Sequence, residues 1–64
     1  MIDGTKIYGL MKQHGMTDEK MANLLGVTAQ MFMWMRHGKR NMRADWLKII
    51  ADFFGVTTDE LYKK

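Results

Sequence analysis

Apolar residues recur every three or four positions along most of the chain, a spacing that places them on one face of an α-helix. No stretch shows the alternation of apolar and polar residues that is typical of a half-buried strand. The pattern therefore predicts an all-α fold of five short helices, at about 4–13, 17–25, 28–36, 43–54 and 58–63. The core residues predicted by the same spacing are Ile7, Leu10, Met11, Met21, Leu24, Leu25, Phe32, Met35, Leu47, Ile50, Ala51, Phe54 and Leu61.

A second local pattern marks where four of these helices begin. A capping residue stands between two apolar residues, one directly before it and one four positions after it. This is a hydrophobic staple: the oxygen of the cap accepts a free backbone N–H of the first turn while the two apolar residues pack together. The four caps are Asp3, Thr17, Thr28 and Thr57, and Glu60 completes a capping box at the last.

The helix expected at 43–54 begins differently. Met42 and Leu47 stand in staple positions, but the residue in the cap position is Arg43. A guanidinium cannot accept the free N–H groups, and it adds positive charge to the positive end of the helix dipole. Asn41 is an alternative cap that would start the helix earlier. In both cases a helix N-terminus and an arginine face the same space, which favours an anion there.

Composition limits the function. The chain has 64 residues, which predicts one domain over residues 1–64, and it contains no cysteine, serine or proline. The usual nucleophiles of covalent hydrolases are thus missing, and two histidines are too few for a catalytic zinc centre without added carboxylates. We therefore expect no enzyme, no cofactor and no metal site. No apolar run approaches the roughly 20 residues of a membrane span, and no signal-peptide pattern is present, so we expect a cytoplasmic protein.

The positive charge of the chain is concentrated in one segment. Residues 36–43 hold four cations and no acid, whereas the net charge of the whole chain is +3. A basic segment on an otherwise nearly neutral body is either an ordinary solvated loop or a binding surface for a polyanion, most often nucleic acid.

Three stretches of the sequence carry a family resemblance. They are residues 16–28, which end in the short glycine-containing turn Gly26-Val27-Thr28, residues 38–41 and residues 50–61. Together they resemble the Cro and phage-repressor (XRE) family of helix-turn-helix DNA-binding domains over nearly the whole chain. Ala22 matches the small residue that lets the two helices of the motif approach. The resemblance implies a compact five-helix bundle of the Cro and lambda-repressor type, with helix 28–36 in the major groove.

Base-reading residues are also implied by the resemblance. By position they are Ala29, Gln30, Met33 and Trp34. Gln30 fits an adenine through N6 and N7, Ala29 and Met33 fit thymine methyl groups, and Trp34 fits a DNA contact and a protein contact equally well. The face departs from the family because Gln30 is its only polar side chain. Asp18 is a second departure, since the family often has a phosphate-contacting glutamine there.

Phosphate contacts are expected from helix starts and from the basic segment, which flank the recognition helix. The predicted residues are Thr17, Thr28, His37, Lys39, Arg40 and Arg43. Lys39, Arg40 and Arg43 are expected to supply most of the non-specific affinity.

Helix 43–54 carries two apolar stripes, more than a simple amphipathic helix needs. The first stripe consists of Ala44, Leu47, Ile50, Ala51 and Phe54, and one of the two stripes is expected to face the core. The second stripe consists of Trp46, Ile49 and Phe53. It either packs under the first helix or forms a dimer contact, and the family resemblance implies a homodimer.

The sequence thus predicts sequence-specific binding of duplex DNA and regulation of transcription, as a repressor. We expect a bacterial or phage-encoded homodimer that associates with the nucleoid. The alternative is a helix-turn-helix domain that binds a protein partner, as an antitoxin or antirepressor module does, through the surface of Met31–Met35. A strong salt dependence of DNA binding would favour the first function, and a salt-insensitive complex with another protein the second.

Overall fold

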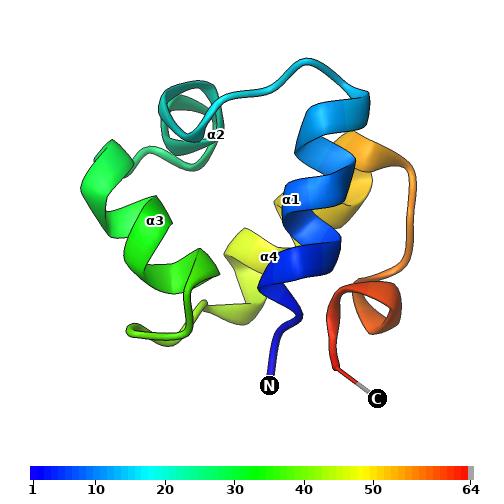
Figure 1. Cartoon of the computed structure of the whole chain (residues 1–64). Coiled ribbons are helices and arrows are strands. Elements are labelled where there is room, and N and C mark those ends of the chain that lie inside the picture. The colour runs from blue at the N-terminus through cyan, green and yellow to red at the C-terminus, as the bar shows by residue number, and fades with distance from the viewer. Residues whose placement is uncertain (64) are drawn as a thin grey trace.

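Four α-helices and a final 3-10 turn follow one another in the computed structural model, which describes residues 1–63 (Figure 1). They are α1 (Gly4–Gln13), α2 (Asp18–Leu25), α3 (Ala29–Arg36), α4 (Ala44–Phe54) and the turn η1 (Thr58–Leu61). Within residues 1–63 no strand forms, and the β-type pairing is confined to one isolated bridge between Ile2 and Tyr62. The predicted all-α class is confirmed.

The fifth predicted helix, 58–63, was wrong in both type and length. It is a four-residue 3-10 turn that ends at Leu61. Tyr62 is extended and pairs with Ile2, and the Leu61 carbonyl accepts the N–H of Asp3 at 2.7 Å. The last residues are therefore paired with the segment before α1, and their backbone groups are not available to lengthen the turn into an α-helix.

The predicted caps define the helix starts. The side-chain oxygens of Asp3, Thr17 and Thr28 accept backbone N–H groups of the following turn at 3.1–3.2 Å. At η1 the Thr57 N–H donates to the Glu60 carboxylate at 2.8 Å. Several helices begin one residue later than predicted, because the cap residue itself has extended backbone angles and lies outside the helix.

The start of α4 lacks a side-chain cap, as predicted. Arg43 is its N-cap and makes no side-chain capping bond, and Ala44 is the first helical residue, so the alternative start at Asn41 was wrong. Asp45 supplies part of what the cap lacks: its carboxylate accepts the Trp46 N–H at 3.0 Å and pairs with Arg43 at 3.0 Å. An acidic side chain in the first turn also suits the helix dipole.

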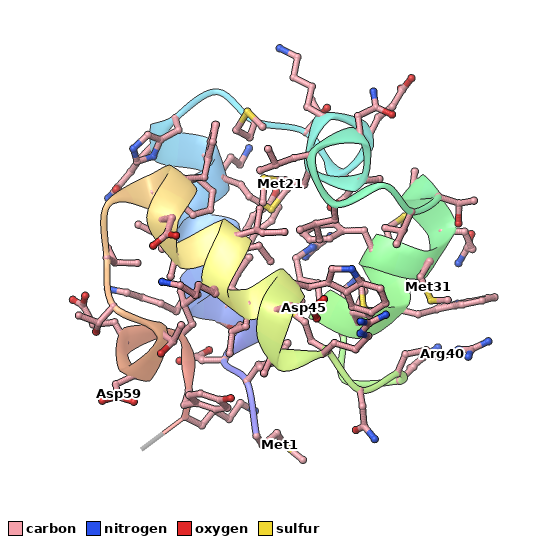
Figure 2. The ribbon with its side chains drawn as sticks, turned by 180° about the vertical axis from the view of Figure 1, so that it is seen from behind. Met1, Met21, Met31, Arg40, Asp45 and Asp59 are labelled. Atoms are coloured by element: carbon pink, nitrogen blue, oxygen red, sulfur yellow. The ribbon has the colours of Figure 1, made fainter. Side chains whose placement is uncertain are left out.

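Twelve of the thirteen predicted core residues are buried. The exception is Leu24, which is 38% exposed, while the unpredicted Ala22 is 2% exposed. The face of α2 that points inward is formed by Met21, Ala22 and Leu25, and Figure 2 shows Met21 between the helices. Leu24 lies outside this face because α2 turns Ala22, and not Leu24, towards the core.

The helices enclose this core from several sides (Figure 1). In Figure 1, α1 lies in front of α4, and α2 and α3 form the opposite side of the molecule. The start of α1 approaches the end of α3 so closely that a Cβ atom on Gly4 would overlap the carbonyl oxygen of Arg36. Glycine at this position therefore lets α1 support the end of α3.

Candidate nucleic-acid interface

The turn between α2 and α3 is short and well defined. Gly26 ends α2 in the left-handed conformation with φ 74°, and the Val27 N–H donates to the Ala22 carbonyl at 3.0 Å. Thr28 then caps α3. Because Ala22 has only a methyl side chain and is buried, α2 and α3 pack at close range, as a helix-turn-helix requires.

The four predicted base-reading residues all lie on α3, and they differ in accessibility. Gln30 is exposed and Trp34 is 37% exposed, whereas Ala29 and Met33 are half-buried. The opposite face of α3 is completely buried, so this side is the one that α3 can offer to a partner.

The surface predicted for a protein partner, Met31–Met35, is smaller than expected. Phe32 and Met35 are fully buried and take no part in it. Met31 is half-buried and packs against the core. What remains accessible is Trp34 with parts of Met31 and Met33.

Two threonines at helix starts meet the geometric needs of a phosphate contact. The hydroxyl oxygens of Thr17 and Thr28 accept the backbone N–H groups of the residues three positions later, and both threonines are exposed. Each hydroxyl hydrogen can therefore still donate to a phosphate oxygen. His37, the third of the predicted polar contacts next to α3, caps the end of that helix and is exposed.

Lys39 and Arg40 extend the set of candidate phosphate contacts beyond the end of α3. Both backbone N–H groups donate to the Trp34 carbonyl, at 2.8 Å and 3.3 Å. Both side chains are exposed, and neither forms an ion pair within residues 1–63. Figure 2 shows Arg40 pointing away from the molecule. These two residues are the cations of the basic segment that keep their full charge for a ligand.

Arg36 is not a free cation, contrary to what its place in the basic segment indicated. Its Nε and NH2 groups donate to the two oxygens of Asp18 at 3.2 Å and 3.1 Å, and its side chain is only 11% exposed. Such a two-bond pair fixes orientation as well as distance. The guanidinium also lies 5.0 Å from the centre of the Tyr8 ring. Arg36 therefore joins α1, α2 and α3.

Asp18 gains a structural role from this pair. A carboxylate at this helix start would repel a phosphate if it were free, but here its charge is balanced by a cation 18 positions later in the chain. Nothing local in the sequence indicates this contact, because both residues also fit ordinary helix-end positions.

Arg43 also has an acidic partner. It pairs with Asp45 at 3.0 Å, and its guanidinium carbon lies 4.9 Å from the centre of the Trp46 ring. Both charged side chains are well exposed, so the pair contributes little to stability. The Asp45 carboxylate does lower the net positive charge that this part of the surface presents to a ligand. The basic segment thus has two cations paired with acids and two without.

The outer side of α4 carries the second predicted surface. Ile49 and Phe53 are exposed, while Trp46 is half-buried and packs against the core. Ile49 and Phe53 are therefore not covered by α1, although packing under the first helix was one of the two expectations for this stripe. Within residues 1–63 there is no group of acidic or histidine side chains that could hold a metal ion, and no helix is long and apolar enough to cross a membrane.

Comparison with known proteins agrees with this geometry. The sequence model of the Cro/C1-type helix-turn-helix DNA-binding domain matches residues 6–63. The chain belongs to this family. It is thus a DNA-binding domain of the Cro/C1 type, which confirms the resemblance carried by residues 16–28, 38–41 and 50–61. No curated protein matches the chain significantly.

Proposed function

We propose that this Cro/C1-type domain is a transcription repressor that inserts α3 into the major groove of a specific duplex DNA site. The observation that carries this proposal is a juxtaposition at α3: an exposed amide, Gln30, on its outer face and two unpaired cations, Lys39 and Arg40, just beyond its end. An amide of this kind forms two hydrogen bonds with adenine, and free cations bind phosphate. Ala29 and Met33 add apolar contacts to thymine methyl groups beside Gln30.

The phosphate contacts that hold α3 in the groove come from both of its ends. At the start of α3 the hydroxyl of Thr28 donates to a phosphate, and the hydroxyl of Thr17 at the start of α2 provides a further contact. At the other end, His37 lies beside Lys39 and Arg40, which provide most of the electrostatic affinity. We assign Arg43 a weaker contact because Asp45 already holds its guanidinium.

A homodimer is the second part of the proposal. Ile49 and Phe53 form an exposed apolar stripe on α4, and the half-buried ring of Trp46 borders it. In a dimer related by a two-fold axis, the same stripe of each copy packs on the other, which removes both from water. Two copies of α3 would then read two half-sites that lie one helical turn apart.

Selection of binding sites from random duplexes tests the proposed function. We expect enrichment of a two-fold symmetric site, and loss of preference at one adenine per half-site when Gln30→Ala is selected in parallel. The cost at that base is about 1–3 kcal/mol. Gln13→Ala makes the same change in an exposed residue at the end of α1 and should select the wild-type site. Recovery of no preferred sequence by the wild-type chain would contradict the proposal.

One observation favours the protein-binding alternative. Three of the four outward residues of α3, namely Ala29, Met33 and Trp34, are apolar or aromatic, as in the centre of a protein interface. An antitoxin or antirepressor would use this face for a protein. The two functions differ in salt dependence, because DNA binding weakens steeply as salt rises and an apolar interface does not.

A further inference from the structure

Each tryptophan of the chain lies under an arginine from the connection between α3 and α4. The guanidinium carbon of Arg40 is 5.5 Å from the centre of the Trp34 ring, and that of Arg43 is 4.9 Å from the centre of the Trp46 ring. Both distances are within the range of a cation–π contact, in which the ring face attracts the positive charge.

The two pairs differ in what else the arginine binds. Arg43 donates to the carboxylate of Asp45, so its charge and part of its donor capacity are used inside the molecule. The Arg40 side chain makes no hydrogen bond or ion pair within residues 1–63. A ring face attracts the charge without occupying the N–H donors as an oxygen would, so the Arg40 guanidinium can still bind an anion.

The backbone fixes the place of Arg40 above the ring. Gly38 turns the chain back with φ 80°, and the N–H groups of Lys39 and Arg40 both donate to the carbonyl of Trp34. The Trp34 residue thus holds the loop twice, through its carbonyl and through its ring. This arrangement orders a long side chain before any ligand arrives, which lowers the conformational entropy lost on binding.

We propose that Trp34 is a positioning residue for a contact to the DNA backbone: its ring holds the Arg40 guanidinium, and Arg40 binds the phosphate. This inference rests on the proposed DNA binding and assigns Trp34 a task other than base reading. The unpaired charge of Arg40, its outward direction and its place next to the recognition helix select a phosphate as the ligand.

A double-mutant cycle tests the proposal on the selected duplex. Arg40→Gln removes the charge and should lower the salt slope of log affinity by about 0.9. Trp34→Leu removes the ring but keeps an apolar residue that suits a helix; it should weaken binding about two- to five-fold, as expected for an exposed cation–π contact, and leave the slope unchanged. In the Arg40→Gln background, Trp34→Leu should have no further effect.

Lys39→Gln is the matched control, because it removes the neighbouring free charge without touching the ring. It should lower the slope like Arg40→Gln, and its effect should multiply with that of Trp34→Leu. Circular dichroism of each variant confirms the native helical content. A loss from Trp34→Leu that is equally large without Arg40 would overturn the proposal, since the ring would then contact DNA itself. If the wild-type chain binds no duplex at all, the proposed DNA binding itself is wrong. This result differs from one in which the chain binds DNA but the Trp34 ring does not act through Arg40.

Discussion

The outer faces of α3 and α4 expose aromatic surface to a similar extent. Trp34 on α3 is 37% exposed, and Phe53 on α4 is 44% exposed. Exposed apolar surface of this kind marks an interaction site but does not say what binds there. By this measure alone the two faces would be given the same function.

The charges around the two faces separate them. Beside α3, Lys39 and Arg40 have no acidic partner within residues 1–63. On α4, Lys48 lies 3.6 Å from Asp52 one turn later, so that cation is balanced within its own helix. A face with unbalanced cations suits a polyanion, whereas a face with balanced charges suits a second protein surface. The pairing of charges, rather than their number, is the reason that we propose DNA as the ligand of α3 and a second copy of the chain as the partner of α4.

The largest effect should come from removing the unbalanced charges. The double variant Lys39→Gln, Arg40→Gln should bind duplex DNA roughly 60-fold more weakly at 0.1 M salt, because two lost phosphate contacts lower the salt slope by about 1.8. Fluorescence anisotropy with labelled duplex at several salt concentrations measures both values. Lys48→Gln removes one balanced charge from α4 and should change neither. Equal losses from the α3 and α4 variants would erase the difference between the two faces.

The next effect concerns the apolar face of α4. Phe53→Ala should weaken the dimer by about 2 kcal/mol or more, roughly 30-fold in its dissociation constant, because central aromatic residues dominate interfaces. Sedimentation should show the shift to monomer while circular dichroism stays native. Leu24→Ala shortens a similarly exposed side chain on α2 and should leave the mass unchanged. A Phe53→Ala protein that sediments with the same mass as the wild-type protein would show that this face of α4 is not the dimer interface.

The sequence predicted what depends on neighbours along the chain. The staples at Asp3, Thr17 and Thr28 set the helix starts because a cap bonds only within its own first turn. The spacing of apolar residues likewise predicted nearly all of the core. It failed at Leu24, which is exposed because the rotation of α2 about its axis turns Ala22 inward instead.

What the sequence could not predict are contacts between distant residues. The bridge of Tyr62 to Ile2, which ends the last turn, joins the two ends of the chain. The Asp18–Arg36 pair removes one cation from the predicted basic segment, and each of its members alone looks like an ordinary helix-end residue. The sequence thus locates the basic segment but does not indicate which of its cations have acidic partners.

A smaller effect tests how firmly α3 is held in place for its task. Gly4→Ala should destabilise the fold by about 1.5 kcal/mol, because the new Cβ meets the Arg36 carbonyl at the end of α3 and the backbone must shift. Gly9→Ala, in the middle of the same helix with open space around it, should stabilise the fold by about 0.5–1 kcal/mol. Thermal unfolding followed by circular dichroism compares the two. A Gly4→Ala protein as stable as wild type would show that α1 does not support α3 at this point.

The smallest effect separates Arg43, which is paired with Asp45, from Arg40, which has no acidic partner within residues 1–63. Arg43→Gln should change DNA affinity less than two-fold at 0.1 M salt, because the charge that it removes is already balanced by Asp45. Asp45→Asn should free the Arg43 guanidinium for DNA and give a steeper salt dependence of DNA binding than that of the wild-type chain. If Arg43→Gln lowers the slope as much as Arg40→Gln, the Asp45 pair opens on DNA and the distinction between the two arginines is lost.

The proposal that α3 binds DNA and α4 forms the dimer is tested most directly by nuclear magnetic resonance. The backbone amide signals of the chain are followed during titration with its selected duplex. If the dimer has already formed before DNA is added, we expect the largest shifts at Thr28, Gln30, Lys39 and Arg40, and small shifts at Ile49 and Phe53. Large shifts confined to Ile49 and Phe53, with α3 unchanged, would contradict the proposal.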